Sequence, residues 1–139
     1  MAAAFPDISL TALLPLTTDQ DVVLSRQAVR KVAQQLGFSL IDQTKIVTAA
    51  SELARNAVVH GHGGSLEWRI VSGSGKQGLQ LTVTDSGPGI EDVTLAMKDG
   101  WTTGSGLGMG LPGAKRLVNE FKIDSKPGAG TTVIVIRWK

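Results

Sequence analysis

Three short segments contain side chains that could do chemistry, and the first lies on an expected helix. Glu52, Asn56 and His60 recur at every fourth position, so on a helix their side chains lie along one line. A carboxylate and an amide oxygen directed at one point would suit a hard cation such as Mg²⁺, or a water molecule that is to be activated. The same spacing occurs on solvent-exposed helix edges that bind nothing, so these three residues alone leave both interpretations open.

The second segment, Thr84–Gly89, follows a strand-like run and reads T-D-S-G-P-G. At the end of a strand the Asp85 carboxylate would be held rigidly and could accept a hydrogen bond from an exocyclic amine. Gly87 and Gly89 would let a flat ring approach the backbone. Asp, Gly and Pro are also common turn residues. Taken alone, the segment indicates a turn.

The third segment, Gly104–Gly113, reads G-S-G-L-G-M-G-L-P-G. Consecutive glycines before a helix expose backbone N–H groups that could bind a phosphate. Part of the segment fits G-x-G-x-x-G, but a dinucleotide-binding fold requires a strand immediately before it, and the preceding residues are not strand-like. The P-loop pattern is absent, because the Gly75–Lys76 pair is followed by Gln77.

Two helices are predicted ahead of these glycines. Thr18 or Asp19 would cap a helix that runs to about Leu36 and ends at Gly37. Ser39 would cap a second helix, from Leu40 to about His60, which a glycine-rich segment ends. Apolar residues recur on one face of each. The second helix therefore carries the Glu-Asn-His series beside an apolar face.

The rest of the chain indicates strands, turns and shorter helices. Strands are predicted at Ile8–Leu16, Leu66–Val71, Leu79–Thr84, Phe121–Ser125 and Thr131–Trp138. Turns or loops are predicted at Ser72–Gly78, Pro127–Gly130 and Gly100–Gly106, the last as a mobile loop. Helices are predicted at Glu91–Lys98 and Met109–Phe121, the latter with Pro112 in its first turn. This order predicts an α+β fold, a two-layer α/β sandwich in which helices cover one face of a mixed sheet.

The composition favours one globular domain and excludes several functions. The 139 residues are 42% hydrophobic and 19% charged, which suits a single domain over residues 1–139. A net charge of +2 without a basic stripe argues against nucleic acid as a partner. No cysteine, no signal-peptide pattern and no apolar run of roughly 20 residues are present. We therefore expect a cytoplasmic protein that does not contact a membrane.

The order of the motifs resembles the Bergerat ATP site, found in the superfamily of histidine kinases, Hsp90-type ATPases and bacterial serine-kinase anti-sigma factors. Glu-x-x-x-Asn on a helix precedes Asp-x-Gly-x-Gly after a strand, then Gly-x-Gly-x-Gly before a helix and Gly-Thr-Thr in a last strand. The resemblance spans Ser51–Val133. It implies the fold expected above, with ATP and Mg²⁺ as cofactors.

A closer resemblance extends from Asp99 to Phe121, D-G-W-T-T-G-S-G-L-G-M-G-L-P-G-A-K-R-L-V-N-E-F, and to the S-E-L-A-R-N segment. Both are similar to the RsbT-type serine kinases of bacterial stressosome and partner-switching pathways. This resemblance implies that Glu52 activates the acceptor hydroxyl or a water, Asn56 binds Mg²⁺ and Asp85 reads the adenine amino group.

The remaining site residues are also implied by the resemblance. Gly87 and Gly89 would shape the adenine pocket, and either Thr131 or Thr132 would assist Asp85. The phosphate loop and its lid would comprise Thr102, Thr103, Gly104, Ser105, Gly106, Leu107, Gly108, Met109 and Gly110. Of these, Thr102–Ser105 would form the lid, and the glycines at 106, 108 and 110 would line the phosphates. The roles of Arg55 and His60 stay open.

The resemblance implies an ATP-dependent protein serine/threonine kinase that acts on a STAS-domain antagonist or scaffold protein. A downstream phosphatase or a sigma factor would be a further partner. Two alternatives share the same ATP site: an anti-sigma factor that binds a sigma subunit directly, and a binding module whose shape ATP sets. The presence of both Glu52 and Asn56 favours retained catalysis. A histidine kinase is not expected, because neither His60 nor His62 lies on a dimerisation hairpin. The oligomeric state stays open.

Overall fold

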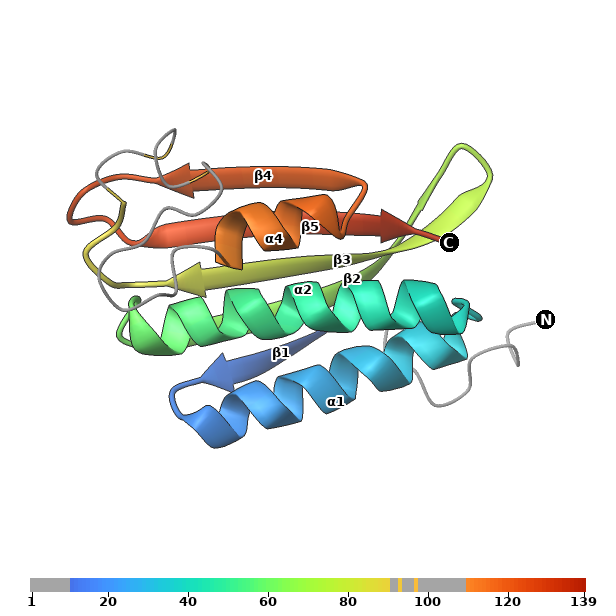
Figure 1. The fold of residues 1–139 in the computed structure, drawn as a ribbon, viewed down its shortest axis with the longest axis horizontal. Helices are drawn as coiled ribbons and strands as arrows, with labels where there is room; N and C mark the ends of the chain where they lie inside the picture. The colour runs from blue at the N-terminus through green and yellow to red at the C-terminus, as the bar shows by residue number, and fades with distance from the viewer. Residues whose placement is uncertain (1–10, 91–92, 94–96, 98–109) are drawn as a thin grey trace.

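The computed structural model describes residues 11–90, 93, 97 and 110–139 (Figure 1). The elements are β1 (Thr11–Leu16), α1 (Asp19–Gln35), α2 (Leu40–Val59), β2 (Gly64–Gly73), β3 (Lys76–Asp85), α4 (Gly110–Arg116), β4 (Glu120–Ser125) and β5 (Thr131–Trp138). The expected strand at residues 8–16 is described from Thr11 onward. The expected mobile loop at residues 100–106 lies outside the described residues. Of the short helix expected at residues 91–98, one hydrogen bond is described, from the Met97 N–H to the Val93 carbonyl at 3.0 Å.

The predicted α+β sandwich is confirmed, with the three labelled helices on one face of a five-stranded sheet (Figure 1). The strand order is β1-β2-β3-β5-β4. The prediction of a mixed sheet is wrong for the described strands, because all four neighbouring pairs are antiparallel. The segment containing α4 does connect two strands of the same direction, β3 and β4. The later strand β5 lies between them, so they never pair.

The two long helices begin where capping residues predicted them. At α1 the Thr18 hydroxyl accepts the Asp21 N–H at 3.2 Å, and the Asp21 carboxylate accepts the Thr18 N–H at 3.1 Å. At α2 the Ser39 hydroxyl accepts the Asp42 N–H at 3.1 Å. Each cap satisfies a backbone donor that the helix leaves free, worth about 1 kcal/mol. Both helix starts are therefore determined locally.

The core lies between the helices and the covered face of the sheet. Alternate residues of β3 and β5 are buried there, whereas the residues between them lie on the open face. Completely buried apolar side chains come from all the described elements except β4: Leu16, Val29, Ala33, Ile46, Ala49, Ala50, Ala54, Leu66, Leu79, Leu81, Ala114 and Val135. α2 packs against both α1 and α4. The apolar face predicted for α2 is thus the centre of the core.

The β2–β3 hairpin is longer than predicted. Strand pairing continues to Gly73 and Lys76, so the loop is Ser74–Gly75 rather than residues 72–78. Both loop residues have positive φ, 50° and 78°, as expected of a two-residue hairpin turn whose twist matches the strands. Near the start of β3, the Lys139 N–H donates to the Gln77 carbonyl at 2.9 Å.

Helix α4 is shorter than predicted, ending at Arg116 instead of Phe121. Beyond it the Asn119 N–H donates to the Ile136 carbonyl at 2.9 Å, and the Asn119 side chain accepts the Trp138 N–H at 2.7 Å. Pairing with β5 thus overrides the helical periodicity of this segment. Pro112 lies in the first turn of α4, as predicted.

Arg137 connects three separate parts of the fold. Its guanidinium donates to the Leu117 carbonyl at 3.0 Å, just beyond α4, and to the Asp42 carboxylate at 2.5 Å, in the first turn of α2. Both charged side chains are largely buried, with 14% of Arg137 and 30% of Asp42 exposed. The hydrogen bond from Arg137 holds the pKa of Asp42 below its usual value. This ion pair positions α2 and α4 against β5.

We expect Asp42→Asn to lower the free energy of unfolding at about pH 7 by roughly 1–3 kcal/mol, the worth of a hydrogen bond to a charged group. Because folding lowers the pKa of Asp42 below 3.8, the stabilisation is present above that value. It is lost as the pH falls through the folded-state pKa. In urea unfolding experiments, the free energies of unfolding of the wild type and of Asp42→Asn should therefore converge as the pH falls through this range. Asp124→Asn, at an exposed carboxylate, is the control. Equal stability at neutral pH would contradict this role of Asp42.

Candidate functional site

The last turns of α2 contain the first predicted site residues. Glu52 and Asn56 lie one helical turn apart and are both half-buried, beside the buried residues Leu53 and Ala57. Neither side chain hydrogen-bonds to another residue within the described parts of the chain. The Glu52 carboxylate and the Asn56 amide therefore lie on one side of the helix, and no described residue forms a hydrogen bond with either of them.

Asp85 is the last residue of β3 and is half-buried. Its Oδ1 accepts the N–H of Gly87 at 3.0 Å. This short-range hydrogen bond orients the carboxylate and engages one of its oxygens, which leaves Oδ2 as the atom able to accept from a ligand. An aspartate held in this way at a strand end is what the sequence predicted.

Gly61 brings the end of α2 into contact with Asp85. A Cβ atom at position 61 would lie 2.6 Å from Asp85 Oδ2, and one at Gly87 would lie 2.6 Å from the Gly61 Cα. The Gly61 N–H also donates to the Asn56 carbonyl at 3.1 Å. The helix that carries Asn56 therefore ends directly against the aspartate. Sequence reasoning missed this role, because the H-G-H-G-G run predicted only a helix stop.

The turn after β3 is held by the β4–β5 turn. The Gly128 N–H donates to the Pro88 carbonyl at 2.6 Å, and the Ile90 N–H donates to the Ser125 hydroxyl at 2.8 Å. Gly89 has a φ of 76°, and a side chain there would collide with the Lys126 carbonyl. Only glycine suits such a position. The segment that follows Asp85 therefore has one defined path.

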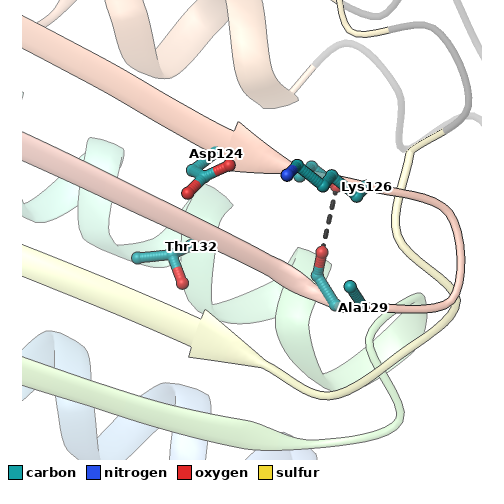
Figure 2. A pocket seen from close by; sticks show the side chains of 6 residues that line it. Asp124, Lys126, Ala129 and Thr132 are labelled. Carbon is teal, nitrogen blue, oxygen red and sulfur yellow. Dashed lines mark hydrogen bonds between the residues drawn. The ribbon is translucent and has the colours of Figure 1, made fainter.

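The two candidate threonines lie on opposite faces of the sheet. Thr131 pairs directly with Asp85 and lies two residues before buried Val133, so both side chains occupy the helix-covered face. Thr132 lies on the open face. There it lines a cavity of about 180 Å³ with Asp124, Ser125, Lys126, Ala129 and Gly130 (Figure 2). The backbone hydrogen bond from the Ala129 N–H to the Lys126 carbonyl, 3.0 Å long, closes the turn beside it.

The remaining predicted residues are placed as follows. Gly110 is the first residue of α4. The loop residues 102–109 lie outside the described residues. Arg55 is exposed and His60 caps α2, with its N–H donating to the Asn56 carbonyl at 2.9 Å. Among the described residues, no group of three or more His, Asp or Glu side chains is arranged to hold a metal.

The fold agrees with comparisons to known proteins. The family model described as "Histidine kinase-, DNA gyrase B-, and HSP90-like ATPase" matches residues 41–139, which include both α2 and the strand end at Asp85. The chain belongs to this ATPase family. Its members use ATP, as the motif order implied. No described helix is long and apolar enough to cross a bilayer.

Two relatives refine the position within the family. The serine/threonine-protein kinase RsbT of Bacillus subtilis is 46% identical over 123 residues, covering 88% of this chain and 92% of the relative. An anti-sigma F factor of Halalkalibacterium halodurans is 34% identical over 121 residues, covering 84% and 83%. The sensor histidine kinase MprB, a mycobacterial protein of known structure, has a TM-score of 0.55 over 91% of this chain and 97% of that one. At 18% identity it supports the fold alone.

We expect Gly61→Ala to weaken ATP binding by more than about tenfold, because the added methyl group would displace the Asp85 carboxylate, which we expect to accept a hydrogen bond from the ligand. Calorimetric titration with Mg-ATP measures this effect, and a thermal melt separates it from unfolding. Gly113→Ala is the control, since a Cβ atom there meets nothing within 4 Å. Unchanged affinity in a folded Gly61→Ala protein would show that the close approach is unimportant for binding.

Proposed function

We propose that this protein is an ATP-dependent protein serine/threonine kinase of a bacterial partner-switching pathway, acting on a STAS-domain antagonist protein. The observation that carries this proposal is the contact between the end of α2 and Asp85. It joins the helix that carries Glu52 and Asn56 to the aspartate expected to read adenine. The 46% identity to RsbT over most of both chains supports the kinase activity. We also expect the protein to act in the cytoplasm, where ATP and such partners occur.

Asp85 is suited to recognise the adenine amine. Its Oδ1 is engaged by Gly87, and its Oδ2 is available as an acceptor. Thr131 shares the face of Asp85 as its direct cross-strand partner. We therefore assign the assisting role to Thr131 rather than Thr132. Gly87 and Gly89 would shape the ring pocket through the turn that they hold against the β4–β5 turn.

Asn56 would supply the protein ligand for Mg²⁺. The ion commonly takes one or two protein oxygens and completes its octahedron with water and phosphate oxygens. A single amide oxygen therefore fits this ion, although the described residues form no multi-carboxylate metal cluster. The amides of Gly106, Gly108 and Gly110 would contact the phosphates, and residues 102–105 would cover them, as the motif implies.

Glu52 would act as the general base. Bound ATP would supply the phosphoryl group, and the partner's hydroxyl must be held in line with it. Glu52 lies one turn before Asn56 on the same side of α2. Its carboxylate would accept the proton of that hydroxyl as the hydroxyl oxygen bonds to the γ-phosphorus and the bond from that phosphorus to the leaving ADP breaks. Catalysis would otherwise depend on positioning and on neutralisation of the phosphate charge.

An anti-sigma factor is the second candidate, and the identity to anti-sigma F factors favours it specifically. Such a protein would share the ATP site and differ in the surface that meets its partner. Affinity capture with the full chain and mass spectrometry would distinguish the two. Capture of a STAS-domain protein would favour the partner-switching kinase, whereas capture of a sigma factor would favour the anti-sigma factor.

We expect Glu52→Gln to bind Mg-ATP nearly as tightly as the wild type but to transfer phosphate about 10²–10⁴-fold more slowly, because an amide cannot accept the proton. A phosphorylation time course with the captured STAS-domain protein measures the rate. A titration with the same partner checks that docking is retained.

Glu67→Gln is the matched control, the same substitution on β2 beside Arg69. It should leave the transfer rate unchanged. Transfer at the wild-type rate by Glu52→Gln would show that Glu52 is not the base. Partner binding without any transfer by the wild type would support a binding module instead.

A further inference from the structure

The outward face of α2 carries little charge. Its exposed residues are Leu40, Ile41, Thr44, Thr48, Arg55 and Val59, of which three are aliphatic. The exposed residues of the neighbouring helix α1 are mostly charged residues and amides: Asp19, Gln20, Leu24, Arg26, Gln27, Lys31 and Gln34. A helix face that meets only water is usually polar in this way. The outward face of α2, which lies between α1 and α4 (Figure 1), is therefore suited to a protein partner.

Glu52 lies at the border between this exposed face and the buried side of α2. Successive residues of a helix are turned by about 100° around its axis, so Asn56 is turned from Glu52 by about 40° toward the buried side. Thr48, Arg55 and Val59 are turned by about 40°, 60° and 20° in the opposite direction, and all three are exposed. The Glu52 carboxylate therefore has Asn56 on one side and three exposed residues on the other.

The side of Glu52 that carries Asn56 is the side expected to meet the nucleotide. It leads to Gly61, where α2 ends against Asp85. A general base for transfer to a protein hydroxyl must reach the γ-phosphate and that hydroxyl at once. With the nucleotide on the Asn56 side, the protein that brings the hydroxyl must approach from the other side. There it meets the three exposed residues, which span roughly 16 Å along the helix axis.

Arg55 is the one charged residue on the exposed face of α2, and it has no ion-pair partner within the described parts of the chain. A guanidinium in this position attracts a carboxylate of a docking protein and fixes how that protein binds. A second copy of this chain would offer only Glu52 from the same face, and the reaction requires Glu52. An acidic segment of the acceptor protein therefore fits this face better than a second copy does.

We propose that Thr48, Arg55 and Val59 form the docking site for the acceptor segment of the STAS-domain protein. Arg55 pairs with a carboxylate that lies close to the acceptor hydroxyl in that protein, and Val59 contacts an apolar side chain beside it. This inference rests on the proposed kinase function. Arg55 selects the protein substrate and does not contact ATP.

The test is steady-state phosphorylation of the captured STAS-domain protein by the full chain at saturating Mg-ATP. Arg55→Glu should raise the KM for that protein at least about tenfold, because the reversed charge repels the carboxylate, with a much smaller change in kcat. Its Kd for Mg-ATP, measured by calorimetric titration, should stay at the wild-type value. Arg55→Lys retains the charge and should keep most of the affinity for the protein. Lys122→Glu, the same charge change at an exposed residue on the open face of β4, is the control.

The partner's carboxylate can be located by charge reversal. The acceptor residue is mapped on the phosphorylated protein by mass spectrometry, and the acidic residues that flank it are replaced by lysine one at a time. Arg55→Glu should phosphorylate one of these partner variants with a lower KM than it shows for the unchanged partner. Val59→Ser removes an apolar contact without changing the charge, and it should raise the KM of the unchanged partner severalfold.

A KM for the protein that Arg55→Glu leaves unchanged would show that Arg55 is only a solvated charge, and the inference would be wrong. Weaker binding of Mg-ATP by Arg55→Glu, in a protein whose thermal melt shows that it is folded, would assign Arg55 to the nucleotide site instead. If the wild type sediments as a dimer and Arg55→Glu as a monomer, the face binds a second copy, which also overturns the inference. A wild type that binds Mg-ATP and the captured protein but transfers no phosphate overturns the proposed kinase function, and the inference with it.

Discussion

The contact between Gly61 and Asp85 couples the end of α2 to the end of β3, and the arrangement of the site depends on it. The helix can approach the strand only because position 61 has no side chain, since a Cβ atom there would lie 2.6 Å from the carboxylate. The close packing of interiors makes such an approach sensitive to a single methyl group. Through it, the helix that carries Asn56 ends against Asp85, so the two residues of the proposed site lie on elements that are in contact.

Two further sets of contacts stabilise this junction from opposite ends. At the far end of α2, the ion pair between Asp42 and Arg137 ties the helix to β5. At the near end, the β4–β5 turn holds the segment after Asp85 through backbone hydrogen bonds and the Ser125 hydroxyl. The same strand, β5, takes part in both, because it carries Arg137 at one end and Thr131 at the other. Strand β5 is therefore the element that aligns the helix layer with the strand ends.

The sequence was most informative where structure is determined locally. The caps at Thr18 and Ser39 and the bounds of β5 were predicted correctly, because capping and alternation depend on neighbouring residues. The end of α4 and the antiparallel sheet were not, because both depend on β5 pairing with distant segments. For the site, the motif order placed Asp85 at a strand end. Gly61 and Ser125 were missed, since a glycine at a helix end and a serine before a turn become informative only when strand register brings them beside Asp85 and Thr131.

The central claim is that one ATP molecule is read by Asp85 while its metal ion is bound by Asn56. A crystal structure of the protein with Mg²⁺ and a non-hydrolysable ATP analogue tests this most directly. The account predicts the adenine amine within hydrogen-bond distance of Asp85 Oδ2, about 2.7–3.2 Å, and the Asn56 amide oxygen about 2.0–2.1 Å from the ion. A nucleotide bound with its base away from Asp85, or a metal ion without Asn56 among its ligands, would contradict the account.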